Sequence, residues 1–169
     1  YTDQWYRPDR MVVGVGGRLG AGLQEPLEEL LGGMAQRETG VPVPVSPNGN
    51  GSRVKVHTKK SDQAHLVLGV RSRPLVDPDR YVLQLLATVL GGGMSSRLFT
   101  EVRERRGLAY YVFGTNHAYT DAGSLYAQSG VDINRIDDAV TTIVEQFRLL
   151  ADEAVPADEL EKARNFAKG

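Results

Sequence analysis

Cysteine is absent from the sequence of 169 residues. Without a thiol, the chain can form no disulfide and can offer no thiolate ligand to a metal ion. This absence fits a reducing compartment, and we expect a cytoplasmic protein. Long apolar runs are also missing, since none approaches the about 18 consecutive apolar residues that a membrane span requires. We therefore expect no membrane partner.

A strong excess of charge of either sign is missing as well. Twenty Lys and Arg residues oppose 21 Asp and Glu residues, which leaves a formal net charge of −1. Such a balance creates no field that would attract nucleic acid. The arginines between residues 97 and 106 are offset by intervening acids, so they predict a solvated helix face. Nucleic acid is therefore not expected as a partner.

Histidine is scarce, and its spacing does not suit a metal site. The three histidines are His57, His65 and His117. None of them stands at the spacing that would put it on one helix face with a second His or a Glu. We interpret them as structural histidines with hydrogen-bond partners. We expect this chain alone to hold no complete zinc site and no other cofactor.

Two glycine-rich segments are candidates for anion binding. The first, from Gly14 to Gly22, has Leu19 where the third glycine of a dinucleotide loop belongs, and no G-K-[ST] sequence occurs, so nucleotide binding is not expected. The second, Gly91 to Gly93, precedes a predicted helix and could hold an anion. The alternatives are a tight connection between two helices or the close approach of another backbone. Ser95 and Ser96 lack the setting of a catalytic serine and are interpreted as helix caps.

The beginning of the chain predicts one strand, one helix and a linker. The apolar run from Met11 to Val15 predicts a buried strand. Leucines and a methionine recur at helical spacing from Leu23 to Met34, where Pro26 suits the first turn and Gly32-Gly33 weaken the end. Residues 40–52 contain three prolines and three glycines. This composition favours an extended linker between two domains.

The rest of the sequence alternates pairs of strands with pairs of helices. Period-2 patterns predict strands at Val54 to Val56, Ala64 to Val70, 110–119 and 124–131, with a hairpin turn joining the last two. Capping residues and apolar periodicity predict four helices. Asp77 caps the first helix, which begins at Pro78. Its apolar stripe consists of Val82, Leu85, Leu86, Val89 and Leu90. The second helix runs from Ser95 or Ser96 to about Arg105, the third includes Ile136 to Leu150, and the fourth begins at Pro156. The order β-β-α-α-β-β-α-α predicts an α+β fold, a two-layer sandwich with helices on one face of the sheet.

Four segments carry a resemblance to a known family. They are Gln63-Ala64-His65, the block GGGMSSRLFTEVRERRGLAYYV at 91–112, the hairpin TDAGSLYAQSGVD at 120–132, and Glu161-Lys162-Ala163-Arg164. Together they resemble the second domain of the inverzincin zinc peptidases, the family of pitrilysin, insulin-degrading enzyme and mitochondrial processing peptidase. Residues 6–11 are similar to the last strand-helix unit of the family's first domain.

The resemblance implies a domain organisation. Residues 1–39 would be the tail end of the first peptidase domain, residues 40–52 the linker, and residues 53–169 the second, non-zinc domain, truncated at its C-terminus. The chain begins at Tyr1 without Met and ends inside a helical pattern, so we expect a fragment of a longer protein. The implied fold is a two-layer sandwich of the LuxS/MPP-like metallohydrolase type.

The family's chemistry is implied for the longer protein, and the fragment is expected to be inactive alone. In this family two similar halves close on an extended peptide, and an H-x-x-E-H motif of the first half, absent here, binds zinc. The second half supplies an Arg and, seven positions later, a Tyr, which Arg103 and Tyr110 match. By this resemblance Tyr110 would donate a hydrogen bond to the oxyanion and Arg103 would hold a substrate carbonyl. Tyr111 is expected on the opposite face of the strand.

The resemblance also implies the partners. The leading hypothesis is the C-terminal part of a zinc-dependent metalloendopeptidase, a hydrolase that binds a peptide or protein substrate together with its own N-terminal half or a homologous subunit. A dimer is one expected form. The alternative hypothesis is a non-catalytic, processing-peptidase-like subunit with a structural or peptide-presenting role. An intact H-x-x-E-H motif upstream would distinguish the first hypothesis from the second.

Overall fold

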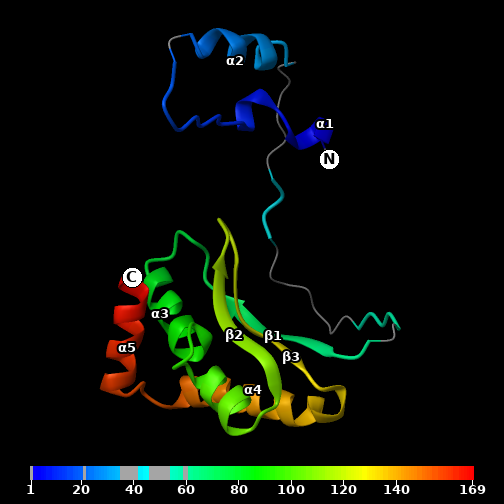
Figure 1. Ribbon diagram of the computed structural model, residues 1–169, viewed down its shortest axis with the longest axis vertical. Helices are drawn as coiled ribbons and strands as arrows, with labels where there is room; N and C mark the ends of the chain where they lie inside the picture. Colours follow the sequence, from blue (N-terminus) through cyan, green and yellow to red (C-terminus); the bar gives the residue numbers. More distant parts are fainter. Residues whose placement is uncertain (1, 21, 35–41, 46–53, 59–60) are drawn as a thin grey trace. The chain divides into compact units, whose positions relative to one another are not determined.

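The computed structural model describes residues 2–20, 22–34, 42–45, 54–58 and 61–169 (Figure 1). The chain divides into two compact units, Tyr1–Pro44 and Val45–Gly169. The division falls inside the predicted linker at 40–52, most of which lies outside the described residues. The assignment of each unit to a particular peptidase domain stays a prediction.

The first unit contains short helices. These are α1 (Thr2–Trp5), the 3-10 helix η1 (Pro8–Arg10) and α2 (Gln24–Leu31). Pro26 lies in the first turn of α2, where its missing N–H needs no partner, and Gly32 caps the C-terminal end. The predicted helix is therefore confirmed, with its end at the glycines.

The predicted strand from Met11 to Val15 is wrong. These residues have no regular secondary structure, and Val12 is 98% exposed. A strand needs a neighbour that pairs with its backbone N–H and C=O groups. The described part of the first unit contains no strand that could supply this pairing. An apolar run alone therefore does not make a strand.

The second unit is built on a three-stranded antiparallel sheet. Its strands are β1 (Ala64–Ser72), β2 (Ala109–Ala118) and β3 (Gly123–Val131), in the spatial order β1-β3-β2. The three predicted strands at these positions are confirmed to within two residues. The central strand β3 pairs with both neighbours along its whole length, so Gln128 lies between Val67 and Phe113.

The predicted strand at Val54 to Val56 is wrong. Both valines are more than 80% exposed, at 84% and 81%, and residues 54–58 have no regular structure. Alternation of apolar and polar residues did not indicate burial here, because no described strand lies beside this segment. From residue 61 onward the order is one strand, two helices, two strands and two helices, so the first strand of the predicted order is missing. Residues 59 and 60 of the predicted turn lie outside the described residues.

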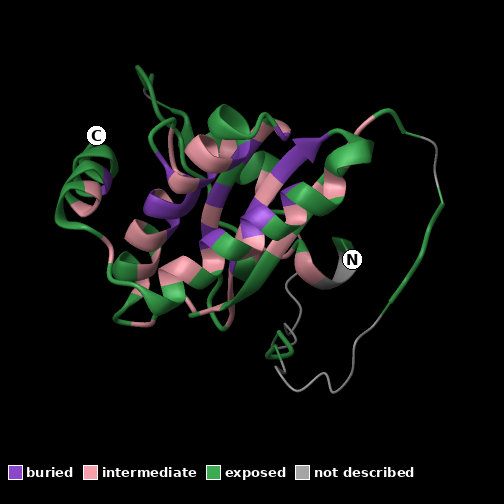
Figure 2. Cartoon of the chain, turned by 90° about the horizontal axis from the view of Figure 1, so that it is seen from below, coloured by how far each residue is buried: buried purple, intermediate pink, exposed green. Residues whose placement is uncertain are grey.

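The helices of the second unit cover one face of the sheet (Figure 1). α3 (Arg80–Gly91) packs on β2, and α4 (Ile136–Asp152), which follows the 3-10 helix η3 (Ile133–Arg135), packs on β1 and β3. α5 (Ala157–Lys168) packs on α3. The buried residues lie between these layers (Figure 2). The core consists of apolar side chains from both layers: Ala87, Leu90, Leu98, Val102, Leu108, Val112, Leu125, Ala127, Val131, Ala139 and Ile143. The coarse prediction of a mixed fold with helices on one sheet face is confirmed.

Helix α3 differs from its prediction at the N-terminal end. It begins at Arg80 rather than Pro78, because the carboxylate of Asp77 accepts a hydrogen bond from the N–H of Asp79 and forms a turn before the helix. Val82, predicted in the buried stripe, is 64% exposed. The buried positions are in the C-terminal half of the helix, including Val89 and Leu90 as predicted.

The close packing of α3 on β2 explains why residue 91, at the C-terminal end of the helix, is a glycine. A side chain on Gly91 would collide with the backbone of Gly114 in β2. The helix and the strand therefore approach each other more closely than any residue with a Cβ would permit. Of the alternatives for Gly91 to Gly93, the close approach of another backbone is confirmed for Gly91.

Candidate functional site

Arg103 lies on η2 (Phe99–Arg105), a π-helix of seven residues. Leu98 before it and Val102 within it are both fully buried at 0% exposure, so the core fixes one side of this element. Arg103 itself is exposed. The helix predicted from Ser95 or Ser96 to Arg105 is thus present, but residues 99–105 form wider π turns, which occur frequently at functional sites.

The capping role expected for the serines is not observed at Ser96. Its hydroxyl donates a hydrogen bond of 2.5 Å to the carbonyl oxygen of Gly93, and the helical residues that follow receive no side-chain cap from it. Ser96 therefore closes the turn between α3 and η2 instead of capping the helix. Its side chain is 5% exposed and belongs to the packing of that turn.

A tight turn joins η2 to β2. Gly107 has a φ of +56°, a left-handed conformation that glycine adopts without strain. The N–H of Leu108 donates to the carbonyl oxygen of Val102 at 2.8 Å, and the side chain of Leu108 is 2% exposed. The chain therefore reverses direction at Gly107 and enters the strand that carries Tyr110.

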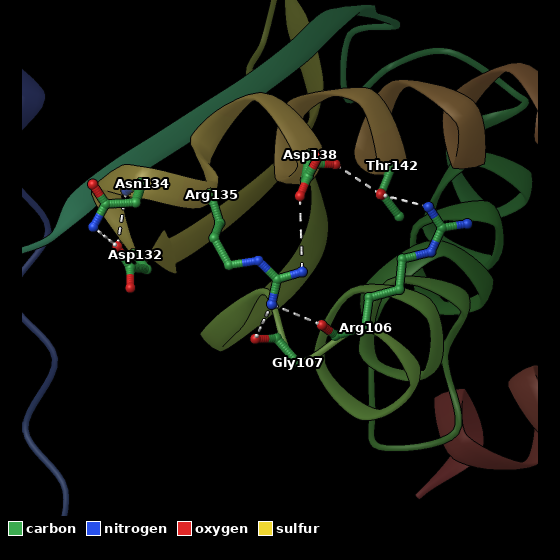
Figure 3. A network of polar contacts seen from close by, with 7 residues as sticks. All are labelled: Arg106, Gly107, Asp132, Asn134, Arg135, Asp138 and Thr142. Atoms are coloured by element: carbon green, nitrogen blue, oxygen red, sulfur yellow. Dashed lines mark hydrogen bonds and ion pairs between the residues drawn. The ribbon is translucent and has the colours of Figure 1, made fainter.

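Side chains from η3 and α4 form hydrogen bonds with this turn (Figure 3). Nη1 of Arg135 donates to the carbonyl oxygens of Arg106 and Gly107, at 3.2 and 3.5 Å. The guanidinium of Arg106 donates in the opposite direction to Oγ1 of Thr142, at 3.0 Å. The other groups in the network are Asp138, which pairs with Arg135, and Asp132, which accepts from Asn134. The turn between Arg103 and Tyr110 is thus held from a helix that comes later in the sequence.

Tyr110 is the extra residue of a β-bulge. In the pairing of β2 with β3, Ala109 lies opposite Val131 and Tyr111 opposite Gly130, so Tyr110 has no partner position of its own. Its side chain is 60% exposed. Bulges redirect side chains and are over-represented next to active sites. The simple alternation that was expected to place Tyr110 and Tyr111 on opposite faces does not apply across a bulge.

Tyr111 lies on the face of the sheet that the helices leave open. Its ring covers Gly130, where a Cβ would collide with the ring, and reaches the far strand. There its hydroxyl lies 3.0 Å from Nδ1 of His65, and the two rings are stacked with centroids 6.2 Å apart. Phe113 stacks on the other side of Tyr111 at the same centroid distance, 6.2 Å. His65 therefore has a polar partner, as expected of a structural histidine.

Three arginines near Arg103 are engaged by carboxylates. Arg97 pairs with Glu159, Arg105 with Glu101, and Arg106 with Glu145. The pair with Glu159 is bidentate, with both distances 2.8 Å, and this hydrogen-bonded carboxylate raises the pKa of Arg97. In the part of the chain that the structure describes, Arg103 has no carboxylate within ion-pair distance. Its guanidinium lies over the ring of Phe99, with the guanidinium carbon 4.9 Å from the ring centre.

The two residues predicted for the site lie on consecutive elements, and no hydrogen bond joins them. Arg103 and Tyr110 are both exposed, at the two sides of the turn that contains Gly107. Sequence reasoning assigned no role to Phe99, although it lies in the block 91–112, and did not identify Arg135 as part of this region. The spacing of four residues between Phe99 and Arg103 was a usable signal, whereas no local pattern could indicate the contacts of Arg135.

The described residues do not fit a metal ion. Within these residues, no group of three or more His, Asp or Glu side chains lies close enough to hold one. We therefore assign no step of any reaction to a metal held by this chain.

Among the described residues, no helix has the length and apolar character needed to cross a membrane.

Comparison with known proteins identifies the family. A family described as "Peptidase M16 inactive domain" matches residues 1–166, and the chain belongs to this family. YmxG of Bacillus subtilis (strain 168), described as an uncharacterized zinc protease, is 33% identical over 171 residues, which cover 100% of this chain and 41% of that protein. The resemblance seen in the sequence is confirmed, and the chain spans about two fifths of the length of this curated relative.

Solved structures share the fold. The peptidase M16 inactive domain from Pseudomonas fluorescens is 26% identical, with a TM-score of 0.62, and the match covers 64% of this chain and 27% of that one. A protease from Helicobacter pylori is 21% identical, with a TM-score of 0.72, over 89% of this chain and 38% of that one. The second likeness concerns the fold alone. The architecture described above is thus a known one for this family.

Proposed function

We propose that this chain is the C-terminal part of a zinc-dependent metalloendopeptidase, in which it binds an extended peptide and supports the oxyanion. The proposal is carried by one observation: Arg103 is exposed, has no carboxylate partner among the described residues, and stands seven positions before an exposed Tyr110. The names of relatives as zinc proteases support a peptidase as the whole protein. On this proposal the chain alone is inactive, because the zinc belongs to another part of that protein.

Each of the two residues has a role that suits its chemistry. The guanidinium of Arg103 offers donors in a fixed planar arrangement, which suits a backbone carbonyl of the substrate. The phenol of Tyr110 donates one hydrogen bond, and a donor of this kind stabilises the negative charge that develops on the scissile carbonyl oxygen. Because both side chains are exposed, a peptide can reach them without any displacement of the core.

The open face of the sheet beside Tyr110 is proposed as the surface over which the peptide runs. This face carries Tyr111, Phe113 and Tyr126, and the helices do not cover it. Aromatic side chains supply contact area at little loss of conformational freedom. Peptide or protein is therefore the proposed substrate class, with the N-terminal half of the same protein or a homologous subunit closing the site.

A second candidate is a non-catalytic subunit that presents peptides or has a structural role. It is favoured by the description of the matched family as an inactive domain. A peptide-presenting subunit would share the peptide-binding role of Arg103. The two candidates differ in whether the residues upstream include an intact H-x-x-E-H motif.

The test is made on the longer protein that contains this chain. Arg103→Ala is compared with Arg148→Ala, an exposed arginine of α4 that is outside the proposed site. Since a hydrogen bond from a charged donor contributes about 1.5–3 kcal/mol, Arg103→Ala is expected to weaken the binding of a fluorescein-labelled casein peptide about tenfold or more. Arg148→Ala is expected to bind like the wild type. Equal affinity in both variants would contradict the proposal.

A further inference from the structure

Arg103 contacts an aromatic ring of its own helix. The guanidinium carbon of Arg103 lies 4.9 Å from the ring centre of Phe99. A cation within about 6 Å of a ring centroid is attracted by the negative face of the aromatic ring. Because Phe99 is half-buried and Arg103 is exposed, the ring can fix the position of the guanidinium from beneath.

The charges around Arg103 make this contact more than a common surface arrangement. Glu101 lies two residues before Arg103, where helical geometry points the two side chains away from each other, and it pairs with Arg105. The other cations of this segment also have carboxylate partners, and in the described residues Arg103 has none. A ring face attracts the cation without placing a carboxylate against its N–H groups. The donors of Arg103 thus stay available to a ligand.

The backbone geometry brings the two residues together. Both belong to the π-helix η2, and they are four residues apart, so they lie on the same side of a helical turn. The fully buried Val102 and Leu98 prevent this element from rotating on the core. A single π turn inside a helix often marks a functional position, and here the whole segment from Phe99 to Arg105 has this form.

We propose that Phe99 is a positioning residue: its ring holds the guanidinium of Arg103 in place while the N–H donors remain available to a substrate carbonyl. This inference rests on the proposed function of Arg103 as a peptide-binding residue. Phe99 itself acts through Arg103 in this account. Because Arg103 is proposed to bind a substrate carbonyl, loss of the ring is expected to weaken substrate binding.

The first part of the test compares two substitutions of Phe99 in the longer protein. Phe99→Leu removes the ring but keeps an apolar side chain, and it is expected to lower kcat/KM for fluorescein-labelled casein about threefold to tenfold, mainly by raising KM. Phe99→Trp supplies a stronger ring face and is expected to restore kcat/KM to near the wild-type value. If the longer protein is not a peptidase, the Kd of the same labelled casein replaces KM as the readout.

The second part is a double-mutant cycle with Arg103→Ala. If the ring acts through Arg103, Phe99→Leu has no further effect on kcat/KM or Kd once Arg103 is alanine. A merely structural role of Phe99 would give the same loss in both backgrounds, and unchanged thermal unfolding of each variant excludes misfolding as the cause.

The outcomes separate the inference from the function on which it rests. A wild-type affinity in Phe99→Leu, or a loss that persists undiminished in the Arg103→Ala background, overturns the role of Phe99 while an impaired Arg103→Ala still supports the proposed function. Wild-type behaviour of Arg103→Ala itself overturns both.

Discussion

Nη1 of Arg135 donates a hydrogen bond to the carbonyl oxygen of Arg106, at a distance of 3.2 Å. The same atom reaches the carbonyl oxygen of Gly107 at 3.5 Å (Figure 3). These carbonyls belong to the turn between Arg103 and Tyr110. The end of η3, directly before the long helix α4, therefore fixes a turn that separates the two proposed substrate-binding residues.

Loss of this contact is predicted to loosen the turn. Arg135→Ala leaves two backbone carbonyls without their donor, and because the side chain is partly exposed we expect the free energy of unfolding to fall by only about 1 kcal/mol. The sharper measurement is amide hydrogen exchange, since the N–H of Leu108 bonds to Val102 across the same turn. Its exchange is expected to be faster in Arg135→Ala.

Two variants control this experiment. Arg135→Lys keeps the positive charge and one donor group, so its exchange rate at Leu108 is expected to lie between those of the wild type and Arg135→Ala. Arg148→Ala, in the following helix α4, should leave the rate unchanged. An unchanged rate at Leu108 in Arg135→Ala would show that the turn does not depend on Arg135.

The close contact of Gly91 with Gly114 predicts that a methyl group is not tolerated at this point. Gly91→Ala places a Cβ against the backbone of β2, where no flexible side chain can move away. We expect the free energy of unfolding to fall by about 1–3 kcal/mol, as in other overpacked cores. Urea denaturation followed by circular dichroism measures this change.

Gly33→Ala is the matched control for Gly91→Ala. A Cβ at Gly33 would meet no heavy atom within 4 Å, and its φ is not in the left-handed region. The substitution should therefore be neutral or slightly stabilising. If Gly91→Ala were equally neutral, the packing of α3 on β2 described here would be incorrect.

Substitution of Ser129, unlike that of Gly91, is predicted to stabilise the fold. Its hydroxyl is the one buried side-chain polar atom without a hydrogen-bond partner among the described residues, and its exposure is 0%. Removing an unsatisfied buried group relieves its desolvation penalty, so Ser129→Ala is expected to raise the free energy of unfolding by up to about 1 kcal/mol. Ser124→Ala, on the open face of the same strand, should have little effect. A clear loss of stability in Ser129→Ala would mean that the hydroxyl has a partner.

The correctly predicted strands are those that have a partner strand, either across a short hairpin or elsewhere in the sheet. β2 and β3 are joined by a short hairpin, so the pattern of each and the turn between them agree. Val54 and Val56 have the same alternation but no described neighbour, and Met11 to Val15 failed for the same reason. A pattern in one segment reports its own preference, whereas a strand also requires a second segment to pair with.

The family was predictable from the sequence, whereas the geometry of the candidate site was not. The motif around Arg103 and Tyr110 was sufficient to name the family, and the assignment of these two residues to a site stays a prediction. The motif did not indicate the π turns of η2 or the bulge at Tyr110, because both depend on how Val102, Leu108 and β3 pack. The contribution of Arg135 comes from a helix that is distant in sequence, and no local pattern could reveal it.

The central claim is that Tyr110 supports the oxyanion in a peptidase formed by the longer protein. The most direct measurement is kcat of Tyr110→Phe, which loses only the phenol oxygen, with fluorescein-labelled casein as substrate. Tyr119→Phe is the control, because Tyr119 is 62% exposed against 60% for Tyr110 and lies beyond the other end of β2. We predict that kcat falls about 100-fold in Tyr110→Phe, as on removal of an oxyanion donor, and stays unchanged in Tyr119→Phe. A wild-type kcat in Tyr110→Phe would contradict the claim.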